Sequence, residues 1–167
     1  VLVAGRHRGL VIEIAQAQVP VSGEVVFKVG DVAPDVLVIL GDVFDRGDNV
    51  TEILWHLFGL EKQASRAGGK LHLLLGNHEL MILGRAQGYI SGKYRTVENI
   101  TGSYYCDLYS PNSVIGSWLR TRPVIISINN ILFVHAGLST EVIRRDFKID
   151  KINRIFTNQI IGKELSS

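Results

Sequence analysis

Three side chains, from three separate segments of the sequence, are suited to holding metal ions. Asp42 has two carboxylate oxygens and can bridge two ions, while the amide oxygen of Asn77 and the imidazole of His135 can complete the coordination of one of them. Two divalent ions roughly 4 Å apart would activate a water molecule and stabilise an in-line displacement at phosphorus. These three residues therefore predict a metal pair that acts on a phosphate ester.

Three further side chains in the same segments are suited to handling the phosphate ester itself. The planar guanidinium of Arg46 matches the spacing of phosphate oxygens. His78 can protonate a leaving alkoxide, and Asp45 can orient the imidazole ring. Taken singly, such residues commonly form surface salt bridges, turns or ordinary core contacts. Their joint occurrence, in this order and at three similar places, favours a catalytic interpretation.

Each of the three segments directly follows an apolar run that predicts a strand. These runs cover residues 36–40, 71–75 and 131–134, and continuous apolar runs are typical of strands covered on both faces. Two further runs, residues 1–4 and 124–128, also predict strands. Ligands of α/β proteins gather at the carboxyl ends of strands, so we expect the three polar segments to converge.

Helical patterns separate the predicted strands. The clearest helix covers residues 50–67, with one face expected to be formed by apolar residues spaced three or four apart: Ile53, Leu57, Leu60, Ala64 and Ala67. Shorter helices are predicted at residues 115–120 and 152–165. Asn129-Asn130 between two strand-like runs predicts a hairpin turn. Residues 84–110 are rich in tyrosine and glycine with weak periodicity, which predicts a functional loop or lid.

Composition narrows the class of protein. An apolar content of 46% over 167 residues is enough to bury a sheet covered by helices. The net charge of +2 gives no reason to expect a nucleic-acid partner. No apolar run approaches the roughly 20 residues of a membrane span, and no signal sequence is visible. Cys106 is the single cysteine, which excludes an internal disulfide and favours a reducing, intracellular compartment, either the cytoplasm or an organelle interior.

The polar segments resemble three blocks of a known enzyme superfamily. GDVFDRG, LLLGNHE and FVHAGLS are similar to the second, third and fourth blocks of the calcineurin-like metallophosphoesterases. The run WLRTRPVIISINNILFVHAGLS is particularly similar to the Shewanella-like protein phosphatases and their bacterial relatives. The resemblance implies an α/β fold, a sandwich of mixed β-sheets flanked by helices, with its C-terminal part missing. It also implies a single, incomplete domain over residues 1–167.

The same resemblance implies a role for each matching residue. Asp42 would be the bridging ligand of two divalent metals, which are manganese, iron or zinc in this superfamily. Asn77 and His135 would bind the second metal. The remaining roles would be phosphate binding by Arg46, the acid dyad of Asp45 with His78, and a structural hydrogen-bonding role for Glu79.

The sequence departs from the family pattern near both ends. The family's first block reads Gly-Asp-x-His-Gly, but residues 5–9 place Arg6 and Arg8 where two ligands of the first metal should stand. A guanidinium group has no lone pair to donate to a metal. Beyond His135 the sequence contains no histidine, although the family supplies another ligand there. Two explanations stay open: a degenerate chain that binds one metal or none, or an incomplete or misread sequence of an active enzyme.

These observations lead to three functional hypotheses. The first is metal-dependent hydrolysis of phosphomonoesters, above all phosphoserine or phosphothreonine in proteins, with little or no activity in the chain as written. The second is a pseudophosphatase that serves as a structural or accessory subunit and binds other proteins. The third is a nucleotide or dinucleoside-polyphosphate hydrolase, in which the tyrosines of residues 84–110 would stack on a base.

Overall fold

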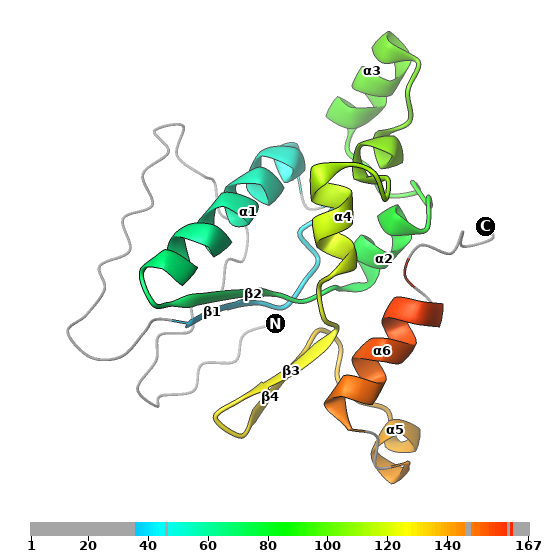
Figure 1. The fold of residues 1–167 in the computed structure, drawn as a ribbon. Coiled ribbons are helices and arrows are strands. Elements are labelled where there is room, and N and C mark those ends of the chain that lie inside the picture. The colour runs from blue at the N-terminus through cyan, green and yellow to red at the C-terminus, as the bar shows by residue number, and fades with distance from the viewer. Residues whose placement is uncertain (1–35, 46, 146–147, 160, 162–167) are drawn as a thin grey trace.

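The computed structural model describes residues 36–45, 47–145, 148–159 and 161 (Figure 1). The predicted strand at residues 1–4 lies outside the described residues, as do Arg6, Arg8 and Arg46. In chain order, the elements are β1 (Val36–Ile39), α1 (Val50–Arg66), β2 (Lys70–Leu73), α2 (Asn77–Leu83), α3 (Gly92–Thr101), the 3-10 helix η1 (Tyr105–Tyr109), α4 (Val114–Arg120), β3 (Ile125–Ile128), β4 (Ile131–Val134), α5 (Thr140–Arg144) and α6 (Ile149–Gln159).

Strands β1 and β2 form a parallel pair joined by α1, which lies alongside them in Figure 1. Their register runs from Val36 opposite Lys70 to Ile39 opposite Leu73. The backbone N–H of Leu74 continues the pairing by donating to the carbonyl of Ile39 at 2.8 Å. Because the strands are parallel, their carboxyl ends lie at one edge, and the polar turns that follow them meet there as expected.

Helix α1 begins at the predicted residue, but its buried face differs from the predicted one. The buried side chains are Val50, Leu54, Leu57 and Leu60, and Leu54 is fully buried. Ile53 is only partly buried, and Ala67 is exposed at the end of the helix. Leu57 and Leu60 are buried as predicted, whereas Val50 and Leu54 complete the buried face in place of Ile53, Ala64 and Ala67.

The Asn129-Asn130 turn is confirmed, whereas full burial of the strands beside it is not. Both asparagines have positive φ angles, 51° and 63°, as a tight type I′ hairpin requires. Within the part of the chain that the structure describes, β3 and β4 pair with each other and with no third strand. Ile131 and Leu132 are therefore each 45% exposed. Helix α6 packs against β3, where the amide of Asn153 donates to the carbonyl of Ile125 at 2.9 Å.

Residues 84–110 form mostly helix, so the prediction of a long loop or lid is wrong in its secondary structure. This segment contains α3 and η1, which are held by three buried tyrosines. The rings of Tyr94 and Tyr105 stack with centroids 4.1 Å apart, and Tyr109 meets Tyr105 edge-on at 5.2 Å. These helices are held by a few large tyrosine rings and not by a regular series of apolar residues. The sequence therefore shows little of the periodicity from which a helix is predicted.

Two smaller points complete the fold. Helix α6 covers the beginning of the predicted 152–165 helix and starts three residues earlier, at Ile149. Across the described ranges, no helix combines the length and the apolar character that crossing a membrane requires.

Candidate functional site

Glu79 fixes the two turns that follow β1 and β2 with a single buried carboxylate. Its Oε2 atom accepts the backbone N–H groups of Asp42 and Gly76, both at 2.7 Å. Its Oε1 atom accepts those of Val43 at 2.7 Å and Phe44 at 3.3 Å. Burial raises the pKa of Glu79, and the four N–H donors oppose that rise because they stabilise the ionised form. One side chain thereby sets the path of the backbone on either side of Asp42.

The two turns touch so closely that both contact points require glycine. A Cβ atom on Gly41 would lie 2.4 Å from the backbone nitrogen of Gly76. A Cβ atom on Gly76 would lie 2.5 Å from Oδ1 of Asp42. Gly41 also has a φ angle of 89°, which L side chains rarely adopt. The glycines of the predicted blocks thus permit the approach of two backbones.

Two aspartates in the first turn adopt left-handed backbone conformations. Asp42 and Asp45 both have a φ angle of 59°. A non-glycine residue in this region is uncommon, and aspartate is among the residues that tolerate it best. Left-handed residues are often found at functional sites, where the surrounding structure holds them in place. Here the hydrogen bonds to Glu79 provide that support for the first of the two.

His78 and Asp45 form the pair that the sequence predicted as an acid dyad. The Nδ1 atom of His78 lies 2.8 Å from Oδ2 of Asp45. The side chains of His78 and Asp45 are only 12% and 3% exposed, so bulk water competes weakly for this bond. A carboxylate only accepts, so Nδ1 donates and Nε2 is the ring atom left to exchange a proton with another molecule. The second carboxylate oxygen, Oδ1 of Asp45, is buried and has no hydrogen-bond partner among the described residues.

His135 brings the third predicted segment to the same place. Its Nδ1 atom donates to the carbonyl of Leu40, which ends the β1 run, at 2.7 Å. Its Nε2 atom lies 3.1 Å from Oδ1 of Asn77 and 3.3 Å from Oδ1 of Asp42. Asp42 also accepts the backbone N–H of His78 at 3.4 Å. His135 is 58 residues from Asn77 and 93 residues from Asp42 in the sequence, yet the potential ligand atoms of all three lie together.

The donor atoms of Asp42, Asn77 and His135 fit a divalent metal. Because Nδ1 of His135 donates to a carbonyl, Nε2 is the ring atom that can bind a metal, and it lies beside the oxygen atoms of Asn77 and Asp42. Ligand atoms that share one metal lie roughly 3 Å apart, given metal–ligand distances of about 2.0–2.2 Å. Of these three residues, only Asp42 and His135 belong to the commonest ligand types, which are His, Cys, Asp and Glu. The part of the chain described here contains no cluster of three or more residues of those types that could hold a metal.

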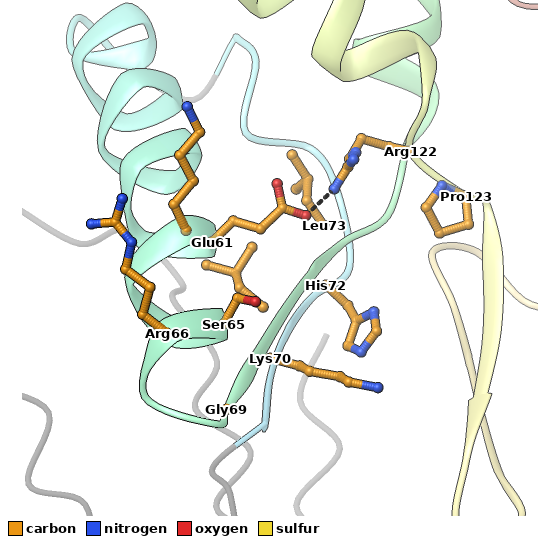
Figure 2. A pocket seen from close by; sticks show the side chains of 11 residues that line it. Glu61, Ser65, Arg66, Gly69, Lys70, His72, Leu73, Arg122 and Pro123 are labelled. Atoms are coloured by element: carbon orange, nitrogen blue, oxygen red, sulfur yellow. Dashed lines mark hydrogen bonds and ion pairs between the residues drawn. The ribbon is translucent and has the colours of Figure 1, made fainter.

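One hollow in the described part of the chain lies away from these residues. It has a volume of about 640 Å³ and is lined mainly by residues of α1 and β2 (Figure 2). The candidate site instead follows the carboxyl end of β2. Glu61 and Arg122 form an ion pair across it, and burial lowers the pKa of His72 beside it. Its lining offers no convergent donor set of the kind seen at Asp42. The candidate site is therefore assigned from side-chain chemistry and not from cavity size.

Sequence reasoning located most of this site but overlooked two contributors. It brought Asp42, Asn77 and His135 to one edge, and it paired Asp45 with His78, as the structure places them. It did not identify the carbonyl of Leu40, because no side-chain signal marks a backbone acceptor. It also did not single out Tyr89, whose ring contacts His78 and whose only signal was its place in the tyrosine-rich segment.

Comparison with known proteins relates the chain to one family. Residues 23–165 match the family model of the calcineurin-like phosphoesterases. The chain is 33% identical to Shewanella-like protein phosphatase 1 of Plasmodium berghei over 106 residues, which is 62% of this chain and 29% of that protein. It is also 33% identical to the symmetrical bis(5'-nucleosyl)-tetraphosphatase of Ralstonia nicotianae over 100 residues, 59% of this chain and 31% of that protein.

A solved phosphatase structure shares the fold of this chain. The chain superposes on the crystal structure of a cold-active protein-tyrosine phosphatase from a psychrophilic Shewanella species with a TM-score of 0.73 and 39% sequence identity. The match covers 78% of this chain and 40% of that one. The chain therefore spans less than half the length of each of these relatives.

Proposed function

Because this chain belongs to the calcineurin-like phosphoesterase family, we propose that it carries the active-site turns of a metal-dependent phosphomonoester hydrolase. The observation that carries the proposal is the juxtaposition of two groups of side chains. The proton-donating pair of His78 and Asp45 lies on the same touching turns as the donor set of Asp42, Asn77 and His135. A proton donor beside a metal-binding set is the arrangement that ester hydrolysis requires.

In this proposal, the donor set holds metal and orients the substrate. Asp42, Asn77 and His135 would bind a divalent ion, and Asp42 has the two carboxylate oxygens that a bridging ligand needs. Bound manganese, iron or zinc would supply positive charge to the phosphoryl oxygens and acidify the attacking water. Arg46, which lies outside the described residues, would contact the remaining phosphate oxygens, as its type and position in the motif suggest.

The chain's own contribution to bond breaking is the His78–Asp45 pair. As a bond forms between the water oxygen and phosphorus, the bond from phosphorus to the ester oxygen breaks. Nε2 of His78 gives its proton to the departing oxygen, so that an alcohol and inorganic phosphate are released. Asp45 holds the ring by accepting from Nδ1 at 2.8 Å, and it stabilises the cationic ring before the proton is given up.

Two relatives support a phosphoprotein substrate, and the name of one of them specifies the phosphorylated residue. Two are named as protein phosphatases, and one of these is a protein-tyrosine phosphatase. Phosphotyrosine therefore joins phosphoserine and phosphothreonine as a substrate to be tested. The similarity to a bis(5'-nucleosyl)-tetraphosphatase makes a dinucleoside polyphosphate the comparison substrate.

The sequence supplies one observation that favours a second function. Arg6 and Arg8 stand where the family places ligands of the first metal, and a guanidinium cation repels a metal ion. A chain with this substitution would keep the fold and bind protein partners with little or no hydrolysis. The proposal of a pseudophosphatase subunit thus depends on those two arginines alone.

The deciding experiment measures metal content and hydrolysis on the same full-length protein. After dialysis, metal is counted by elemental analysis, and phosphate release from phosphoserine and phosphotyrosine peptides is followed with added Mn²⁺. His135→Ala is expected to lose metal. His78→Asn is expected to keep metal while its kcat falls by about 10²- to 10⁴-fold. His56→Asn, a substitution in α1, serves as the matched control.

Each outcome decides between the two functions. Bound metal and turnover that depend on His135 and His78 would support the hydrolase. Metal that is retained equally by His135→Ala would contradict the proposed ligand set. Neither metal nor turnover in the parent protein would favour the pseudophosphatase, and the search would then turn to its protein partners.

A further inference from the structure

Tyr89 is an exposed aromatic side chain that touches the proposed proton donor. Its ring centroid lies 5.4 Å from that of His78, and the two ring planes meet at 69°. The tyrosine side chain is 64% exposed, in contrast to the buried Tyr94, Tyr105 and Tyr109 of the same segment. Most of its ring is thus available to a molecule that approaches His78.

The backbone around Tyr89 is anchored on both sides. The next residue, Ile90, is only 6% exposed and belongs to the hydrophobic core. The guanidinium of Arg95 donates to the carbonyl of Gln87 at 3.0 Å, and the backbone N–H of Arg95 donates to the carbonyl of Ser91 at 3.2 Å. These contacts hold the short connection before α3, so Tyr89 is presented at a defined place beside the histidine.

A leaving group that takes its proton from His78 must come close to the ring that Tyr89 contacts. Asp45 occupies Nδ1 of His78, so an ester oxygen that takes the proton must approach Nε2. Proton transfer requires that oxygen to come within roughly 3 Å of the nitrogen. The atoms bonded to that oxygen then lie beside the histidine ring, within reach of the exposed Tyr89.

We propose that Tyr89 is a specificity-determining residue that favours esters whose leaving group is an aromatic ring bonded directly to the phosphoryl oxygen. Phosphotyrosine and other aryl phosphates have this chemistry. Aromatic rings attract one another in edge-to-face or offset arrangements with centroids about 4.5–7 Å apart, a range that a ring next to the transferred proton can reach. This inference rests on the proposed hydrolase function and names the class of substrate for the same site.

The alternatives offer a poorer fit to this geometry. The leaving group of phosphoserine is a short alkyl chain, which has no ring to pack against Tyr89. In a dinucleoside polyphosphate the base is separated from the cleaved bond by a ribose and at least one phosphate, so it would lie well beyond the histidine. A ring directly attached to the ester oxygen would be close to His78 and to Tyr89, whose rings contact each other.

The test compares an aryl with an alkyl ester in the full-length, Mn²⁺-loaded protein. The measured quantity is the ratio of kcat/KM for phenyl phosphate to that for ethyl phosphate, so differences in intrinsic reactivity cancel between variants. Tyr89→Ala is expected to lower this ratio roughly 3- to 10-fold, mainly through KM, as the energy of one aromatic pair predicts. Tyr89→Phe keeps the ring and is expected to keep the ratio. Tyr104→Ala replaces another exposed tyrosine and is the matched control.

Two results would overturn the inference. One is an equal effect of Tyr89→Ala on both esters. The other is a loss confined to diadenosine tetraphosphate, which would place a nucleobase on Tyr89. If no ester releases phosphate, the proposed function fails, and the inference is judged by binding alone. Calorimetric titration with phenylphosphonate and ethylphosphonate should then show weaker binding of the phenyl compound alone in Tyr89→Ala, and equal binding would reject the role of Tyr89.

Discussion

At the scale of single residues, Glu79 has the greatest influence on the site without belonging to its chemistry. It is fully buried, and its two carboxylate oxygens accept four backbone N–H groups from two turns. Those turns carry Asp42 and His78, so the carboxylate controls where the proposed metal ligand and the proposed proton donor lie. A buried acceptor with four donors also satisfies N–H groups that would otherwise be costly to bury.

We expect Glu79→Gln to destabilise the protein although it preserves the size of the side chain. An amide has one oxygen, so its NH₂ group would face two backbone N–H donors and leave them unsatisfied. The expected loss is about 1–3 kcal/mol of unfolding free energy, measured by urea denaturation. Glu141→Gln, in which an exposed residue of α5 is changed, is the control and should stay within about 0.5 kcal/mol. Equal midpoints for the two variants would show that the four hydrogen bonds do not support the turns.

At the scale of elements, tyrosine hydroxyls connect the start of α1 to the helices of residues 84–110. The Oγ1 atom of Thr51, in the first turn of α1, lies 3.0 Å from the hydroxyl of Tyr109. The hydroxyl of Tyr109 donates to that of Tyr105 at 3.0 Å. The hydroxyl of Tyr94 accepts the backbone N–H of Thr51 at 3.0 Å. This network places η1 and α3 beside the helix that follows the turn carrying Asp42 and Asp45.

Tyr109→Phe is expected to weaken this connection. Removing the hydroxyl takes a partner from Thr51 and from Tyr105 while leaving the packed ring in place. The unfolding free energy should fall by about 1–2 kcal/mol, measured by thermal or urea denaturation. Tyr104→Phe, at a side chain that is 61% exposed, should change stability far less. An equal loss of unfolding free energy in both variants would show that the hydrogen bonds of the buried Tyr109 hydroxyl do not stabilise the fold.

At the scale of the whole molecule, an aromatic path connects the site to the core. Phe44, which belongs to the turn after β1, is fully buried and meets the ring of Tyr109 edge-on at 4.8 Å. A second set of contacts joins α1 to α4, where Trp118 packs edge-on against Phe58 and donates from its indole nitrogen to Glu61 at 2.7 Å. The turn after β1 is therefore tied to the same hydrophobic cluster that holds the helices.

The buried phenols predict a loss of stability in alkali. Burial raises the pKa of both Tyr105 and Tyr109, so the folded protein favours their neutral forms more strongly than the unfolded chain does. Their stabilising contribution is present below the ordinary tyrosine pKa of about 10 and is lost as the pH rises above it. Burial also raises the pKa of Cys106, which adds an effect of the same sign.

This prediction is checked by measuring the thermal midpoint of the metal-free protein from pH 8 to pH 11. The midpoint should fall with increasing steepness above about pH 10. The double variant Tyr105→Phe with Tyr109→Phe should show a shallower fall, because its rings have no proton to lose. An unchanged slope in the double variant would assign the alkaline sensitivity to other groups.

Much of the fold and of the candidate site could be predicted from the sequence. The family and the α/β class were confirmed by the comparisons and by the structure. Helix α1, strands β1 and β2 and the asparagine turn were predicted close to their observed bounds, because local periodicity and turn chemistry govern them. The single-domain assignment stays a prediction, as do the metal-binding and catalytic roles.

The sequence by itself determined which chemical groups are present and that they follow strands. Parallel pairing of strands makes their carboxyl ends meet, so the meeting of the turns that carry Asp42 and His78 followed from sequence order. What only the tertiary structure decided were contacts between distant segments: the four hydrogen bonds of Glu79, the carbonyl of Leu40 on His135, and Tyr89 beside the dyad. Such contacts depend on how elements pack in three dimensions, and no local pattern of residue types encodes their distances.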